Sequence, residues 1–313
     1  MKIKSYIKQR IFALYKLITR LGIHIIPVHY YSPVPDIIEL KKTKHLWAKK
    51  SKLPGLKIDL NEQLKAIKQI CLPYKSEYKN NFNFQYAVEN AFGPGFDYIE
   101  AQTLHAIVRF FKPAKIVEVG SGVSSWCMLK AEEINKKETG QRAEITCIEP
   151  FPSEKLKSLK RIKLLKDQVQ SVPFEELFIN LKRDDLLFID SSHSVKPGSD
   201  VNYLILEILP RLNPGVIVHF HDIFLPYDYK RSVLQTFYQW SETSLLHAFL
   251  INNNKVKIIF CESQLHYDRK EDLKVIFPEY NPQLDENGIQ DNKYKPFENI
   301  KEHFPSSIYL QIQ

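Results

Sequence analysis

One carboxylate and two glycines lie close together at the end of the short apolar run Lys115–Val119. Gly120 permits a sharp turn with a positive φ, and Gly122 leaves room for a ligand to approach the backbone. A loop that binds a dinucleotide normally carries three glycines in the pattern G-x-G-x-x-G, and the third is absent here. The carboxylate of Glu118 would repel a pyrophosphate. The loop therefore favours a ligand that carries a cationic sulfonium or ammonium group.

A second acid, Glu149, ends the next apolar run, Glu144–Glu149. An acid at the end of a second strand can accept hydrogen bonds from both hydroxyls of a ribose. Doubly wound sheets bind their ligands at the carboxyl ends of the strands, where both acids are expected. These observations predict a site for S-adenosylmethionine. The residues expected to bind it are Glu118, Gly120, Ser121, Gly122, Glu149 and Asp190.

Two further carboxylates are expected at neighbouring strand ends. Asp190 ends the run Asp185–Asp190, and Asp222 follows the run Val216–His221. Two carboxylates at this edge can hold a divalent cation, and Mg²⁺ prefers such oxygen ligands. A cation at Asp190 and Asp222 would lower the pKa of an acceptor hydroxyl and orient its oxygen for in-line attack on the sulfonium methyl group.

Histidines accompany both of these acids. His193 lies three residues after Asp190, on the loop above the sheet, where a neutral imidazole could act as the general base for an acceptor hydroxyl. His221 adjoins Asp222 and could be a second base or an orienting donor. His219 lies deeper in the same strand, and we interpret it as structural.

The elements that must position these residues follow a regular alternation of apolar β-branched runs and helical stretches. Strands that alternate with helices imply right-handed crossovers and one parallel sheet. We therefore predict an α/β fold: a doubly wound, Rossmann-like, mainly parallel seven-stranded sheet with helices on both faces and an N-terminal helical accessory region. The expected strands are Lys115–Val119, Glu144–Glu149, Ile162–Leu165, Asp185–Asp190, Val216–His221, Lys255–Phe260 and Ser307–Gln311.

The stretch E-x-G-x-G-x-S, followed by C-I-E-P, resembles motif I and the next acidic motif of class I S-adenosylmethionine-dependent methyltransferases. Residues 188–226 resemble a narrower subgroup, related to macrocin-type sugar O-methyltransferases and cephalosporin hydroxylase-like proteins. The resemblance implies methylation of a hydroxyl on a sugar, a glycan or another small molecule, with a metal at Asp190 and Asp222. The chain departs from the pattern at Ser124, where many members have a third glycine, and in having P-G-V rather than P-G-G at residues 214–216.

Two other functions are compatible with the same fold. One is an NAD- or nucleotide-binding Rossmann-like protein, against which Glu118 and the missing third glycine argue. The other is a non-catalytic protein that uses the fold to bind a partner. Nucleic acid is not an expected partner, because much of the net charge of +8 comes from the N-terminal helix. The predicted fourth strand also ends in I-D-S-S rather than in an N-P-P-Y-type tetrapeptide of enzymes that methylate amino groups, which favours an oxygen acceptor.

The sequence divides into three predicted regions. Residues 1–35 form a basic amphipathic helix and a Pro/Tyr linker, and residues 36–96 form an accessory region. Residues 97–313 form the methyltransferase domain, with a polar, loop-rich insertion at about residues 262–305 in which the charged stretch Asp285–Glu298 is expected to be solvated.

The N-terminal region carries no acid before Asp36 but contains the basic residues Lys2, Lys4, Lys8, Arg10, Lys16 and Arg20. A basic amphipathic helix suits peripheral contact of residues 1–25 with an anionic membrane surface, or packing against its own domain or another subunit of a homo-oligomer. Neither a transmembrane span nor a signal peptide is expected, because charges interrupt the apolar stretch.

The four cysteines are Cys71, Cys127, Cys147 and Cys261, and none forms a C-x-x-C pair. We expect reduced, buried thiols and a cytoplasmic location, with contact at the inner face of the membrane if the helix binds lipid.

Overall fold

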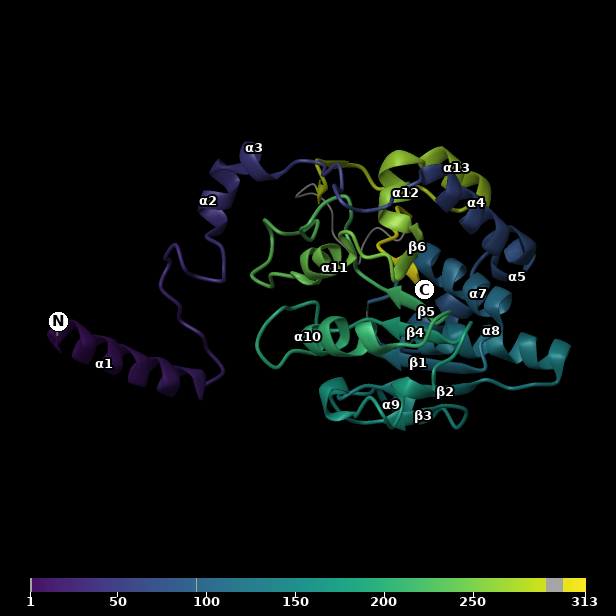
Figure 1. Ribbon diagram of the computed structural model, residues 1–313, viewed down its shortest axis with the longest axis horizontal. Helices are drawn as coiled ribbons and strands as arrows, with labels where there is room; N and C mark the ends of the chain where they lie inside the picture. Colours follow the sequence, from purple (N-terminus) through teal and green to yellow (C-terminus); the bar gives the residue numbers. More distant parts are fainter. Residues whose placement is uncertain (1, 94, 291–300) are drawn as a thin grey trace. The chain divides into compact units, whose positions relative to one another are not determined.

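The computed structural model describes residues 2–93, 95–290 and 301–313 (Figure 1). The chain divides into two compact units, Met1–Trp47 and Ala48–Gln313. The first unit contains the predicted basic helix as α1 (Lys2–Thr19), followed by α2 (Ile37–Lys42) and α3 (Lys44–Trp47). The carboxylate of Asp36 caps α2 by accepting hydrogen bonds from the backbone N–H groups of Ile38 and Glu39.

The second unit is built on a seven-stranded sheet in the order β3-β2-β1-β4-β5-β9-β6. All of its pairings are parallel except those of β9, which is antiparallel to β5 and β6. This confirms the predicted seven-stranded, mainly parallel sheet. The chain order reverses between β1 and β4, which is where open α/β sheets bind ligands. The strands are β1 (Lys115–Val119), β2 (Glu144–Ile148), β3 (Lys163–Leu165), β4 (Leu186–Ile189), β5 (Ile217–Phe220), β6 (Val256–Cys261) and β9 (Ile308–Ile312).

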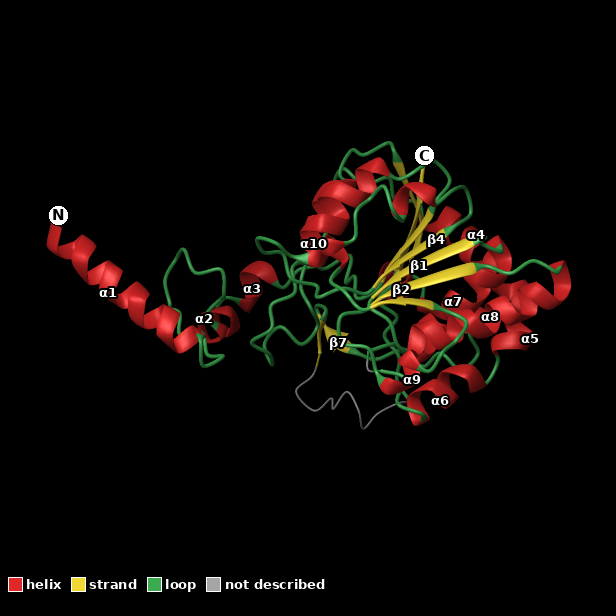
Figure 2. Cartoon of the chain, turned by 90° about the horizontal axis from the view of Figure 1, so that it is seen from below, coloured by secondary structure: helices red, strands yellow, loops and turns green. Residues whose placement is uncertain are grey.

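Helices cover both faces of the sheet, because successive side chains of a buried strand point to opposite sides. In β1, Ile116 packs into one apolar cluster and Val117 into the other. The first cluster involves α4 (Leu60–Cys71), α7 (Tyr98–Phe111) and α8 (Val123–Thr139). Figure 2 shows α7 and α8 on one side of the strands and α10 on the other. The second cluster involves α10 (Asp200–Asn202), which continues as a π-helix (Tyr203–Ile208) and a 3-10 helix (Leu209–Arg211), and α11 (Glu242–Leu250).

The boundary between the compact units lies earlier than the predicted boundary between residues 96 and 97. Residues 48–96 belong to the same unit as the sheet. The reason is α4, whose Ile67, Ile70 and Cys71 are buried in the same cluster as residues of β1 and α7. This segment also contains α5 (Lys75–Tyr78) and α6 (Phe82–Glu89).

The segment 262–305 differs from the polar, loop-rich insertion that the sequence predicted. It contains α12 (Glu262–Asp268), α13 (Lys270–Ile276) and a hairpin of β7 (Asp285–Glu286) and β8 (Ile289–Gln290). Leu265, Leu273 and Ile276 are buried in the core. The prediction was wrong because several polar residues of this segment are buried and hydrogen-bonded. The carboxylate of Glu262, for example, accepts a hydrogen bond from the hydroxyl of Thr103 (2.5 Å). Of the charged stretch 285–298, residues 291–298 lie outside the described part.

A short helix, α9 (Glu154–Lys157), lies between β2 and β3. All four cysteines are buried and free, as expected. Among the described residues, no helix is long and apolar enough to cross a membrane.

Candidate active site

The glycine-rich loop that follows β1 runs directly over the end of β4. Gly120 has a φ of +77°, and a Cβ placed on it would lie 1.8 Å from the carbonyl oxygen of Asp190. Gly122 precedes α8, and its Cβ would lie 3.4 Å from the Cα of Gly93. A glycine at position 120 is therefore required both by the backbone conformation and by the close approach of the two strands.

Glu118 lies on the inner side of this loop rather than facing a ligand. Its side chain is 0% exposed, and it accepts hydrogen bonds from the hydroxyls of Ser124 (2.6 Å) and Ser125 and from the thiol of Cys147 (3.1 Å). Burial raises the pKa of Glu118 to about 7, although these hydrogen bonds oppose the shift. The predicted repulsion between Glu118 and a pyrophosphate is therefore not supported. Its carboxylate instead holds the first turn of α8 against the end of β1.

Glu149 follows β2 and is only partly buried. One carboxylate oxygen accepts a hydrogen bond from the backbone N–H of Ser121 (3.2 Å), and the other accepts one from that of Phe151 (2.8 Å). Each carboxylate oxygen has two acceptor sites, so Glu149 keeps capacity for hydroxyl groups of a ligand. The structure thus brings Ser121 and Glu149 together, as the sequence predicted.

Asp190, His193 and Asp222 form a compact cluster at the carboxyl ends of β4 and β5. One ligand atom from each residue can be chosen so that all three lie within 4.8 Å of one another. The Nε2 atom of His193 is 3.3 Å from Asp190 Oδ1 and 3.7 Å from Asp222 Oδ2. The two carboxylates are expected neighbours, since Ile189 of β4 pairs with Phe220 of β5.

The backbone is strained at two of these three residues. His193 has a φ of 57° and Asp222 a φ of 55°, in the left-handed region that non-glycine residues seldom adopt. Such strain persists only where surrounding contacts over-determine it, and it tends to occur at functional sites. At His193 the carbonyl oxygen accepts hydrogen bonds from the backbone N–H groups of Ser241 (2.9 Å) and Glu242 (3.2 Å).

The second ring nitrogen of His193 is engaged by Glu242, a residue that the sequence did not suggest. His193 Nδ1 lies 2.7 Å from Glu242 Oε2, and the imidazole packs 4.3 Å from the ring of Trp240. Burial alone would lower the pKa of His193, but the hydrogen bonds to Asp190 and Glu242 and the charges of Glu242 and Asp222 raise it to about 10. A general base must be a neutral imidazole. In the absence of a bound cation, the raised pKa of His193 favours the protonated form instead.

His221 also departs from the predicted role of a second base. Its Nδ1 is 3.2 Å from Asp190 Oδ1 and its Nε2 is 3.0 Å from Glu100 Oε2. Burial lowers the pKa of His221, but the nearby carboxylates of Glu100, Asp222 and Asp190 raise it well above its usual value. Because a carboxylate faces each nitrogen, neither is free to take a proton from an acceptor. The geometry favours the alternative role of an orienting donor.

Glu100 is the second buried acid that sequence analysis missed. It is 0% exposed and accepts hydrogen bonds from the backbone N–H of Ser306 (2.9 Å) and the hydroxyl of Ser307 (2.5 Å). Its signal in the sequence is a lone carboxylate in an otherwise mostly apolar helical stretch, I-E-A-Q-T-L-H-A-I-V. His219 is structural, as predicted: it is buried, lies 2.8 Å from the Ser307 hydroxyl and stacks on Tyr309.

A cavity of about 500 Å³ opens beside the cluster. Its wall includes His221, Asp222 and Glu100. Gly93, whose backbone lies against Gly122, also lines the cavity. Polar and charged residues such as Asp97, Gln283 and Glu302 also line it. Six aromatic side chains complete the apolar part of the wall: Phe84, Phe96, Tyr98, Phe224, Trp240 and Phe304.

Two basic side chains, Lys230 and Arg231, also line this cavity. The ammonium group of Lys230 lies 3.1 Å from the centroid of the Trp240 ring. Burial lowers the pKa of Lys230, while the charge of Asp222 raises it. The cavity therefore combines flat apolar surfaces with charged groups of both signs.

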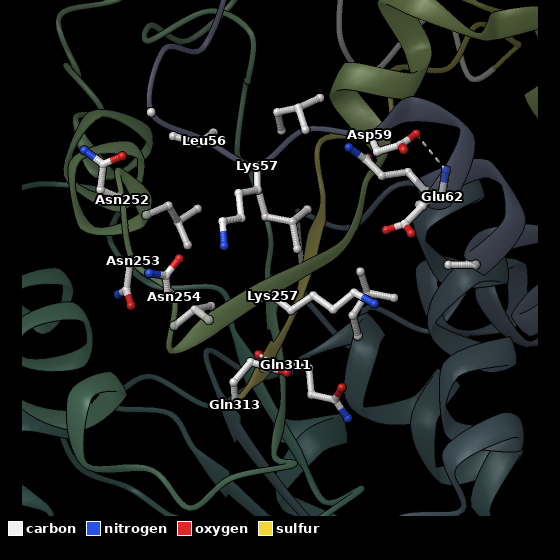
Figure 3. A pocket seen from close by; sticks show the side chains of 18 of the residues that line it. Leu56, Lys57, Asp59, Glu62, Asn252, Asn253, Asn254, Lys257, Gln311 and Gln313 are labelled. Atoms are coloured by element: carbon white, nitrogen blue, oxygen red, sulfur yellow. Dashed lines mark hydrogen bonds between the residues drawn. The ribbon is translucent and has the colours of Figure 1, made fainter.

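A larger cavity, of about 620 Å³, lies away from all of these residues (Figure 3). It flanks the edge strand β6, and Figure 3 shows Lys57, Lys257 and the asparagines 252–254 around it. None of the site residues predicted from the sequence lines it. Volume alone therefore does not identify the site.

Residues 117–223, which run from β1 past β5, match the family model described as a methyltransferase domain. This match confirms the resemblance to class I methyltransferases over that part of the chain; the narrower subgroup is not distinguished by it. An uncharacterized protein of Archaeoglobus fulgidus is 34% identical over 139 residues. The similar region covers 42% of this chain and 60% of that relative, so the chain matches less than two thirds of its length.

Several solved methyltransferases are distantly similar. A methyltransferase of Podospora anserina, solved with S-adenosylhomocysteine, is 17% identical; the match covers 72% of this chain and 92% of that chain, with a TM-score of 0.36. An O-methyltransferase of Streptomyces achromogenes involved in tomaymycin synthesis, solved with S-adenosylmethionine, is 14% identical. That match covers 71% of this chain and 86% of the other, with a TM-score of 0.37.

Proposed function

We propose that this protein is an S-adenosylmethionine-dependent methyltransferase that methylates a hydroxyl of a sugar, a glycan or another small molecule. The observation that carries the proposal is the juxtaposition of two features at one edge of the sheet. The glycine turn with Glu149 offers a nucleoside site, and the Asp190–His193–Asp222 cluster lies beside an aromatic cavity. The match of residues 117–223 to a methyltransferase domain supports the same assignment.

A thermal-shift comparison of the purified protein with S-adenosylmethionine, S-adenosylhomocysteine, NAD and no ligand tests the cofactor. We expect both sulfur nucleosides to stabilise the fold, by about 2.7 kcal/mol at 100 times Kd, and NAD to have no effect. Stabilisation by NAD alone would favour the nucleotide-binding alternative. No response to any nucleoside would favour the non-catalytic one.

Glu149 is proposed to accept the ribose hydroxyls, so its substitution is expected to weaken cofactor binding selectively. Hydrogen bonds to a charged group are worth about 1.5–3 kcal/mol. We therefore expect Glu149→Gln to raise the Kd for S-adenosylhomocysteine by about 10–100-fold in calorimetry. Glu144→Gln is the matched control, because Glu144 begins the same strand and is exposed. Equal affinity in the two variants would remove Glu149 from the site.

The cluster also fits a divalent cation, which we propose to be Mg²⁺ or Mn²⁺. Asp190 and Asp222 supply oxygen atoms, and His193 supplies Nε2. A metal-binding histidine usually donates its other N–H to a carboxylate, which fixes the tautomer, and Glu242 is placed to accept that hydrogen bond. The two carboxylates suit Mg²⁺ and Mn²⁺, whereas the single imidazole is a ligand type that also suits zinc and iron.

In this arrangement His193 acts as a ligand rather than as a free base. A bound cation would lower the pKa of an acceptor hydroxyl, so that its proton passes to solvent water, and would orient the oxygen. The oxygen would then take the methyl group as the bond from sulfur to that methyl breaks, which leaves S-adenosylhomocysteine. The residues of the chain do the remaining work. His221 lies between Asp190 and Glu100 and orients the carboxylate of Asp190. The aromatic side chains of the cavity would cover the flat face of an acceptor. The positive charge of Lys230 in the wall of the cavity favours an acceptor that itself carries an acidic group.

Activity itself is tested by transfer of a tritiated methyl group into a cell-envelope glycan extract, with and without EDTA. We expect incorporation that EDTA abolishes and Mg²⁺ or Mn²⁺ restores. Unchanged incorporation in EDTA would contradict the proposed role of the metal.

The cytoplasmic location remains part of this proposal, supported by four free cysteines.

A further inference from the structure

The segment from Ile11 to Tyr31 has an unusual amount of apolar side chain that its own compact unit does not cover. Eleven large apolar residues in it are exposed, from 43% for Ile26 to 93% for Tyr30. Large contiguous apolar surfaces on a protein mark contact sites for another molecule or a membrane. The eleven exposed apolar residues of this segment are Ile11, Phe12, Leu14, Leu17, Leu21, Ile23, Ile25, Ile26, Val28, Tyr30 and Tyr31.

The charge of the same region indicates what covers this surface. The first 35 residues contain six lysines and arginines and no acid. Lys16 lies among the exposed apolar residues of α1, and Arg20 directly follows that helix. The Lys16 ammonium is 5.1 Å from the centroid of the Phe12 ring. A second copy of this segment would bring like charges together, which is unfavourable. An anionic surface complements both the charge and the apolar side chains.

The length and composition of the segment favour lying on a bilayer over crossing it. Helix α1 has 18 residues and contains Lys16 near its end, whereas a span needs about 20 predominantly apolar residues. Amphipathic helices with lysines and arginines bind in the plane of the interface, with their apolar residues among the acyl chains. Tyr30 and Tyr31, whose rings contact each other edge to face, are of the type enriched at the membrane–water interface.

We propose that the segment from Ile11 to Tyr31 docks the protein on an anionic phospholipid surface. This inference does not depend on the proposed methyltransferase activity. The apolar side chains supply the binding energy, and the basic residues select membranes that carry a negative surface charge. Docking would concentrate the domain that contains the sheet near acceptors attached to, or dissolved in, the same membrane.

The test uses the full-length protein and sedimentation with vesicles of phosphatidylcholine, alone or with about 30% phosphatidylglycerol, a composition that supplies a negative surface potential. We expect partition that is at least about 10-fold stronger on the anionic vesicles and that falls steeply when salt is raised from about 0.1 M to about 1 M, because salt screens surface charge. Each lysine or arginine near the surface contributes about a factor of five. Replacing both Lys16 and Arg20 with Gln should therefore weaken partition about 30-fold.

A second variant, with Leu14 and Leu17 both replaced by Gln, should lose binding at either salt concentration. The control variant replaces Lys49 and Lys52, two exposed lysines of the second unit, with Gln and should bind like the parent protein. Stabilisation by S-adenosylhomocysteine should be the same in all variants, which separates this test from that of the proposed function. Absence of lipid binding, equal partition on neutral vesicles, or an oligomer in light scattering that the leucine variant converts to monomer would overturn the proposal.

Discussion

Replacing Gly120 with Ala is expected to abolish measurable binding of S-adenosylhomocysteine, a loss of at least about 100-fold. A methyl group at this position would lie 1.8 Å from the carbonyl oxygen of Asp190, and that oxygen belongs to backbone at the end of the central strand β4. Neither backbone can move without breaking the pairing of β1 with β4, which runs through Val119 and Ile189. The loop must therefore distort where the cofactor is proposed to bind.

The matched control for this variant is Gly140→Ala. Gly140 ends α8 with a φ of +75°, nearly the same as that of Gly120, but a Cβ on it would have no atom within 4 Å. Both variants carry the cost of a left-handed alanine, about 1–2 kcal/mol. Only Gly120→Ala adds steric overlap, which typically costs a further 1–3 kcal/mol, roughly.

Urea unfolding gives the stability of each variant, and calorimetry gives its affinity. We expect Gly140→Ala to bind S-adenosylhomocysteine like the parent protein. Equal behaviour of the two alanine variants in both measurements would mean that the loop tolerates a side chain, and it would remove the close approach as the reason for Gly120.

Replacing His193 with Ala should weaken Mn²⁺ binding by at least about 100-fold while leaving the affinity for S-adenosylhomocysteine unchanged. The reason is that Nε2 of His193 faces both Asp190 and Asp222, so the variant removes one of three proposed ligands. Electron paramagnetic resonance of free Mn²⁺ measures this binding without requiring the acceptor to be known.

The same experiment distinguishes a ligand from the free base that the sequence suggested. A base contributes to methyl transfer but not to metal affinity, so unchanged Mn²⁺ binding with lost turnover would restore the original prediction. Glu242→Gln should weaken Mn²⁺ binding by about 10–100-fold, the usual cost of losing the carboxylate that orients a histidine ligand. His247→Ala is the control, because His247 lies on the same helix as Glu242 but lines neither cavity.

Local patterns were sufficient to predict the sheet and the residues that stand at its carboxyl edge. Buried parallel strands are short apolar runs, and their ends converge. For that reason Gly120, Glu149, Asp190 and Asp222 could be placed at one edge from the sequence alone. The separation of Asp190 and Asp222 along the chain did not matter, since neighbouring strands bring them together.

The orientation of a side chain within that edge could not be predicted in the same way. Glu118 alternates along β1 with Val117 and Val119, and the pattern does not say whether a carboxylate at the end of a strand faces a ligand or the first turn of the next helix. The hydroxyls of Ser124 and Ser125 stabilise the inward orientation.

The sequence by itself determined the class of fold, the glycine turn and the acids at the ends of the strands, because each of these depends on short-range periodicity and chain chirality. Only the tertiary structure placed Glu242 against His193 and Glu100 against His221. These partners come from α11 and α7, respectively 49 and 121 residues away along the chain. Contacts over such separations are set by how helices pack on the sheet, and no local pattern of residues encodes them.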